Sequence, residues 1–227
     1  MFGKIGRTDF RYLTSVTFGI FWAILGLSYL FNGLSIAAEY IGISGMSIAF
    51  FQASFASLLM TTAPLAYFIF HVLLGDSKIS TIASLIFMVV GIIGIILLFT
   101  LGVDGPYPDP WIPEFHIDQL LKLLFVFGLY VPSLCMILAL LPFIALRRTP
   151  KFTQYKVTLA LISLSLVYDF VLFGVLGIGG APHLISNLFI LLGALLGYIA
   201  FFPPDIVIRV LKLEPQEFEE YEGNGDL

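Results

Sequence analysis

The sequence predicts an all-α fold, a polytopic transmembrane helical bundle of six spans with both termini in the cytoplasm. Three observations lead to this prediction. Hydrophobic residues make up 59% of the 227 residues and charged residues only 11%, whereas a typical soluble domain carries about 25% charged residues. Six apolar stretches are long enough to cross a bilayer. Nearly all lysines and arginines then fall on one side of the membrane.

One transmembrane domain is predicted over residues 1–213, followed by an acidic cytoplasmic tail over 214–227. Six of the fifteen acidic residues lie in this tail. The predicted spans are residues 13–37, 47–74, 79–103, 117–146, 155–175 and 183–202. They use most of the chain and leave only short loops.

The first span follows a polar, basic segment. A secretory signal peptide is the alternative interpretation, because Ser35-Ile36-Ala37 is similar to a cleavage site. The apolar stretch is longer than the apolar region of about 7–15 residues in a signal peptide. An uncleaved helix is therefore favoured.

The second span is the most polar, and Pro64 inside it predicts a kink. Only residues 75–78 separate it from the third span, so these two helices should pack antiparallel. Four prolines in residues 104–114 exclude a helix and predict a rigid, acidic, aromatic loop. The fourth span is long and should tilt or project from the membrane.

A glycine-containing turn, residues 177–182, separates the fifth span from the sixth, and Pro203-Pro204 ends the sixth. With the N-terminus in the cytoplasm, ten of the eleven basic residues lie on the cytoplasmic side, and Lys122 alone lies toward the opposite side. This asymmetry predicts the orientation and supports the count of six.

Small residues recur in the first and sixth spans. Gly19, Gly26 and Gly33 form a stripe in the first, and Gly193 and Gly197 form a GxxxG motif in the sixth. Such residues let membrane helices approach closely. Packing inside the chain is one interpretation, and a dimer or partner interface, above all at Gly193 and Gly197, is the other.

Asp169 is the clearest ionisable side chain inside a span, and such groups are costly in a bilayer. Ser165 lies one turn away, and Lys122 lies at a similar depth in the preceding span. We expect Asp169 to contact Lys122, as a structural ion pair or as part of an ion-coupled site. Alternatively, Lys122 pairs with Asp118 four residues earlier.

Gln52 and Thr61 belong to the polar second span. Hydrogen bonding between helices is the simpler interpretation of these residues, and the lining of a cavity shared with Asp169 is the functional one.

Several classes of protein are disfavoured. The sequence contains no zinc-protease, P-loop, serine-hydrolase or dinucleotide-binding motif. The sequence therefore predicts no catalytic residue, metal site or cofactor. No basic block suggests nucleic acid. The predicted surroundings are the lipid bilayer, with a homo-oligomer or a membrane-complex partner.

Six apolar spans with short loops and an aromatic outer loop resemble the multi-helix membrane sensor regions of microbial signalling proteins. No diagnostic motif accompanies this resemblance, so no residue role is transferred. The leading expectation is a non-catalytic module of the cell membrane, either sensor-like or an accessory subunit. A small ion- or proton-coupled transporter or channel using Asp169 and Lys122 is the alternative, and a lipid-modifying membrane enzyme is a third.

Overall fold

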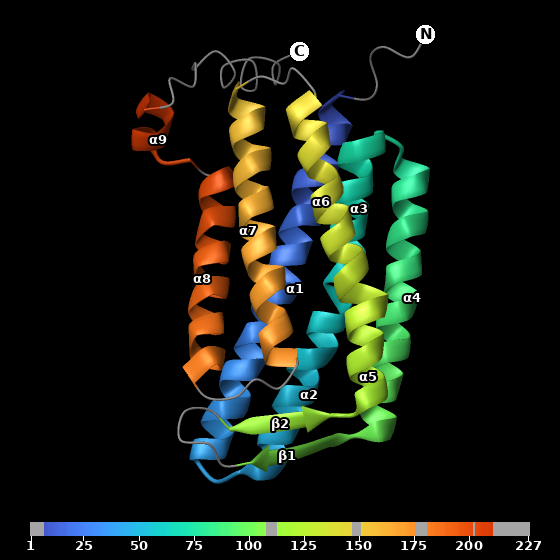
Figure 1. The fold of residues 1–227 in the computed structure, drawn as a ribbon, viewed down its shortest axis with the longest axis vertical. Helices are drawn as coiled ribbons and strands as arrows, with labels where there is room; N and C mark the ends of the chain where they lie inside the picture. Colours follow the sequence, from blue (N-terminus) through green and yellow to red (C-terminus); the bar gives the residue numbers. More distant parts are fainter. Residues whose placement is uncertain (1–6, 108–112, 147–150, 176–180, 202, 211–227) are drawn as a thin grey trace, which may run out of the picture.

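The computed structural model describes residues 7–107, 113–146, 151–175, 181–201 and 203–210. Long helices stand side by side, and a β-hairpin crosses one end of the bundle (Figure 1). In chain order the elements are α1 (Arg7–Tyr40), α2 (Ser44–Met60), α3 (Thr62–Leu74), α4 (Ser77–Leu101), β1 (Val103–Tyr107), β2 (Glu114–Ile117), α5 (Gln119–Leu123), η1 (Leu124–Tyr130), α6 (Val131–Leu146), α7 (Lys151–Val175), α8 (Ala181–Phe201) and α9 (Asp205–Val210).

Four stretches of the described chain are long and apolar enough to cross a membrane. They are Val16–Tyr40, Ser44–Leu74, Ser77–Leu101 and Gln119–Pro142. Two shorter apolar stretches, Val157–Tyr168 and Ile185–Ala200, lie within α7 and α8. The structure thus confirms a predominantly helical fold with four helices of membrane-spanning character.

The outward face of α4 is composed of large aliphatic and aromatic side chains. Those exposed on this helix are Ile79, Ile82, Leu85, Ile86, Val89, Ile92, Ile93, Ile96, Phe99 and Leu101. Soluble monomers rarely expose an apolar patch of more than a few hundred Å². A lipid environment removes this cost, because the outward side chains then contact hydrocarbon.

The polar second span is interrupted where α2 gives way to α3. The amide of Thr61 donates to the carbonyl of Leu58, three residues back, at 3.1 Å. The Thr61 hydroxyl donates to the same carbonyl at 2.7 Å. Pro64 has no amide hydrogen, and its ring collides with the carbonyl four residues earlier. A disturbance of the helix at Pro64 was expected, and the break lies within one turn before it.

The fourth predicted span is a single run of helix from α5 through η1 to α6. Its middle section, Leu124–Tyr130, is π-helical, and it ends just before Pro132. A π-helical turn contains an extra residue and often marks a functional site. Nothing in the sequence pattern predicted it.

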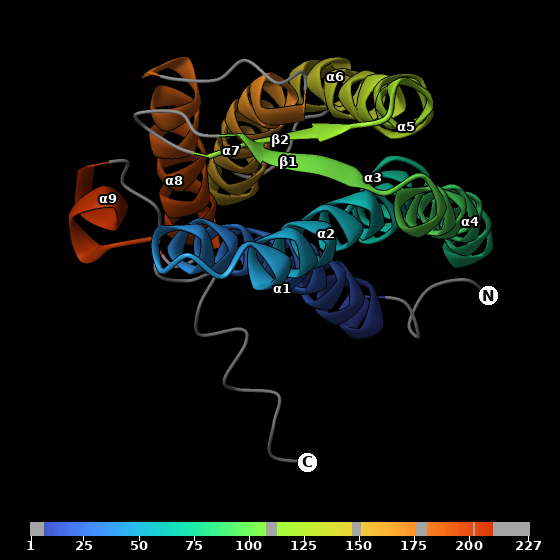
Figure 2. The same cartoon turned by 90° about the horizontal axis from the view of Figure 1, so that it is seen from below.

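The proline-rich connection corrects the all-α prediction, because part of it forms a β-hairpin. Strands β1 and β2 pair antiparallel, with Val103 opposite Ile117 and Asp104 opposite His116. Proline excludes helix but is tolerated on the edge of a sheet, and both strands of a two-stranded sheet are edges. Seen along the bundle, the hairpin runs between the α1–α2 row and the helices α5, α6 and α7 (Figure 2).

Two pairs of serines fasten α1 to α2. Ser35 and Ser47 exchange hydrogen bonds, each hydroxyl donating to the other's carbonyl, at 2.8 and 2.9 Å. Seven residues away on each helix, the Ser28 hydroxyl donates to the Ser54 carbonyl at 2.9 Å. Small hydroxyl side chains allow close approach and supply polar contacts between membrane helices.

Candidate functional site: a polar cavity beneath the hairpin

A cavity of about 80 Å³ lies at the end of the bundle that carries the hairpin. We call it the hairpin cavity. Helices α1, α2, α7 and α8 and strand β2 contribute its lining, which consists of Ser28, Tyr29, Asn32, Phe51, Ser54, Phe55, Leu58, Phe115, Ile117, Val171, Ser186, Asn187 and Ile190. None of these side chains is charged. The cavity combines hydroxyl and amide groups with an aromatic wall, a combination that is typical of small-molecule sites.

The serine contact between α1 and α2 sets the position of the polar wall. Ser28 and Ser54 both line the cavity, and their hydroxyl oxygens lie 3.3 Å apart. Since Asn32 follows Ser28 by four residues, it lies on the same face of α1, one turn nearer the hairpin.

An aromatic stack joins the hairpin to the bundle. The rings of Phe51 on α2 and Phe115 on β2 lie nearly parallel, with centroids 4.3 Å apart. The ring of Phe55, one turn along α2, contacts Phe125 on η1 at a centroid distance of 5.8 Å. Such ring pairs stabilise by about 0.5–1.5 kcal/mol beyond their burial. The hairpin therefore forms one wall of the cavity through a packed contact.

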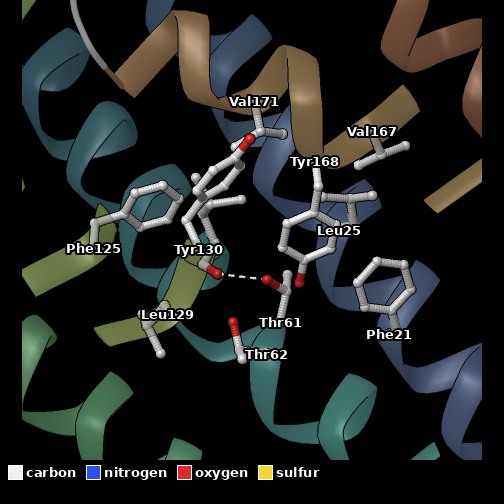
Figure 3. A pocket seen from close by; sticks show the side chains of 11 residues that line it. Phe21, Leu25, Thr61, Thr62, Phe125, Leu129, Tyr130, Val167, Tyr168 and Val171 are labelled. Atoms are coloured by element: carbon white, nitrogen blue, oxygen red, sulfur yellow. Dashed lines mark hydrogen bonds between the residues drawn. The ribbon is translucent and has the colours of Figure 1, made fainter. Parts of the chain in front are cut away.

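A second cavity, of about 10 Å³, is shown in Figure 3. Leu58 and Val171 line both. The smaller cavity also borders the α2–α3 break at Thr61 and the end of η1 at Tyr130. The hydroxyl of Tyr168, on α7, is buried and makes no hydrogen bond within the described part of the chain. Thr61 and Thr62 line the same cavity as Tyr168 (Figure 3).

The sequence-predicted polar residues are not gathered into one site. Thr61 is buried and lines the smaller cavity, whereas Gln52, Ser165 and Lys122 are half-buried and line neither cavity. The side chain of Asp169 lies outside the described residues, so its expected contact with Lys122 stays a prediction.

The alternative pairing of Lys122 with Asp118 also stays a prediction. The Asp118 carboxylate accepts a hydrogen bond from the Leu120 amide at 2.7 Å through one of its two oxygens. Asp118 thus caps the N-terminus of α5, a position where aspartate is favoured.

The two groups of glycines lie in different surroundings. A Cβ added to Gly193 would approach Val167 at 2.9 Å, and one added to Gly197 would approach Trp22 at 2.7 Å and Ser163 at 2.8 Å. The GxxxG motif therefore packs within the chain, against α7 and α1. In contrast, Gly19, Gly26 and Gly33 have no heavy atom within 4 Å of an added Cβ. At these three glycines, α1 therefore does not lie against another described helix.

Sequence reasoning did not single out most of the polar residues around the hairpin cavity. Tyr29, Asn32, Ser186 and Asn187 were all missed. One signal was present for Asn32, which is the only amide side chain within residues 13–37. A polar side chain inside a membrane span requires a partner or a function.

Histidine, cysteine, aspartate and glutamate form no cluster of three or more in the described residues that could hold a metal ion. No family model matches the chain, and no curated protein or solved structure is significantly similar to it. Fold and site together define a helical protein with four helices of membrane-spanning character and a polar cavity at one end.

Proposed function

We propose that this chain is a non-catalytic membrane module, sensor-like or an accessory subunit, and that the hairpin cavity is its ligand site. The observation that carries the proposal is the position of the polar cavity at the hairpin end of the bundle. Farther from the hairpin, side chains such as Leu65, Ile69 and Leu140 are 0–1% exposed. A ligand that enters from the hairpin side would therefore end at a closely packed part of the bundle, as in a receptor.

The module has six spans in this proposal, with both termini in the cytoplasm. Helices α7 and α8 contain 25 and 21 residues, and about 20 residues suffice to cross a bilayer. Both stand beside the other long helices (Figure 1). Lys78 and the start of α7 at Lys151 lie at the end opposite the hairpin, which supports a cytoplasmic assignment for that end.

Cysteine labelling tests this orientation. In a Cys135→Ala background, we expect Tyr107→Cys in the hairpin to react with a membrane-impermeant maleimide on intact cells. Lys78→Cys, in the first turn of α4, should react only after the membrane is permeabilised. Both positions are exposed, so a difference in reactivity reports the side of the membrane. Labelling of Lys78→Cys on intact cells would reverse the orientation.

A small transporter is the second candidate, and one observation favours it. The two cavities share Leu58 and Val171 and border the break between α2 and α3. Interrupted helices next to a central cavity are a feature of many transporters. In this alternative, Asp169 and Lys122 couple the movement of an ion or a proton.

Flux measurements distinguish the two candidates. For the purified full chain in sealed liposomes, we expect no flux of protons, sodium or potassium above that of protein-free liposomes. Asp169→Asn should then leave the traces unchanged. Flux that depends on the protein and disappears in Asp169→Asn would establish transport and reject the module.

A further inference from the structure

Two polar side chains of α1 face the hairpin cavity. The Asn32 amide and the Tyr29 hydroxyl both line it, and both residues are half-buried. An amide offers two donors and an acceptor, and a phenol offers one donor and an acceptor. A bound molecule with both donors and acceptors can hydrogen-bond to both groups.

The charge of the lining restricts the ligand. All thirteen lining residues are uncharged. An ion in this cavity would lose its hydration without gaining an opposite charge, which is strongly unfavourable. The ligand group is therefore neutral.

The volume restricts the ligand further. An apolar cavity of about 150 Å³ holds benzene. On that scale, a cavity of about 80 Å³ holds a group of about three or four non-hydrogen atoms. Phe51, Phe55 and Phe115 provide an aromatic part of the lining that can contact its carbon atoms.

We propose that the hairpin cavity binds a neutral carboxamide or hydroxyl group, hydrogen-bonded to Asn32 and Tyr29 and packed against Phe51 and Phe115. This inference rests on the proposed function and names its ligand class. Two sources carry this chemistry, a small free solute and the glycerol headgroup of a neutral lipid. For either source, the volume of the cavity matches the carboxamide or hydroxyl group that would bind in it.

Thermal unfolding of the full chain in detergent tests the proposal. The probes are acetamide, its charged counterpart acetate, glycerol and monooleoylglycerol. We expect acetamide, at about ten times its Kd, to raise the unfolding midpoint by about 3–6 °C, and acetate to have no effect. A larger shift with monooleoylglycerol than with glycerol identifies a lipid as the source, and equal shifts identify a free solute.

Two variants assign the effect to the cavity. Asn32→Leu, which keeps the volume and removes the hydrogen bonds, should abolish the acetamide shift. Tyr29→Phe removes one hydroxyl and should lower the affinity about five-fold. It keeps the proposal testable if Asn32→Leu fails to fold. Tyr67→Phe is the matched control, because Tyr67 lies on α3 and does not line the cavity, and its shift should equal that of the wild type.

Three results would overturn the ligand class. They are no shift of the unfolding midpoint with any neutral probe, an equal shift with acetate, and a shift in Tyr29→Phe as large as that of the wild type. None of these results bears on the flux measurement. Protein-dependent ion flux rejects the module even when acetamide binds, so the two proposals fail separately.

Discussion

Gly91→Leu should lower the free energy of unfolding by about 3 kcal/mol or more, measured in mixed detergent micelles. A Cβ at Gly91 would lie 2.8 Å from the backbone carbonyl oxygen of Leu59 and 3.1 Å from the sulfur of Met60. A flexible side chain can rotate away from such a contact, but a carbonyl inside a helix cannot. The substitution therefore forces α4 and α2 apart and opens the core around Leu59, which is 0% exposed.

The matched control is Gly26→Leu, the same substitution on the outward face of α1. No heavy atom lies within 4 Å of a Cβ added there, so the new side chain would extend into the surroundings. The free energy of unfolding of Gly26→Leu should stay within about 0.5 kcal/mol of the wild-type value or rise slightly, because glycine weakens a helix interior. Equal losses in both variants would contradict the packing of α2 on α4.

Gly197→Leu is expected to cost about 2–3 kcal/mol of unfolding free energy while leaving the oligomeric state unchanged. The added side chain would meet the Trp22 ring and the Ser163 hydroxyl. The Ser163 hydroxyl donates to the Gly193 carbonyl at 2.6 Å, so displacing it also breaks a bond between α7 and α8. Both contacts lie within one chain, and the effect is therefore on the fold.

Light scattering of the detergent complex supplies the second readout for Gly197→Leu. A change in mass at unaltered stability would instead place the GxxxG motif between copies of the chain. Gly33→Leu is the control, because no heavy atom lies within 4 Å of a Cβ added at this position of α1. We expect neither its mass nor its stability to change.

The ends of the helices followed closely from the sequence. The third predicted span, 79–103, corresponds to α4 at Ser77–Leu101, and the fourth, 117–146, to the continuous helix from Gln119 to Leu146. The polar turn at Gly75 and the prolines after Asp104 interrupt the apolar runs, and such signals are local. The hairpin was missed because its strands are short and its pairing joins residues separated by the proline-rich segment.

The polar contacts between helices were harder to predict. Thr61 was singled out from a polar helix and does border a cavity, but Asn32 and Tyr29 were passed over. Serines spaced by seven residues, 28 with 35 and 47 with 54, were a visible signal for the α1–α2 contact. Their pairing depends on which faces of the two helices meet, and no local pattern specifies that.

The sequence by itself determined that apolar helices of bilayer length make up this protein, because backbone groups in hydrocarbon must bond within their own segment. Only the tertiary structure decided which side of each helix faces inward. In a soluble protein, the apolar stripe marks the buried face. In lipid the outward face is equally apolar, as on α4, so Gly91 and Gly26 look alike in the sequence although only Gly91 lies against a neighbouring helix.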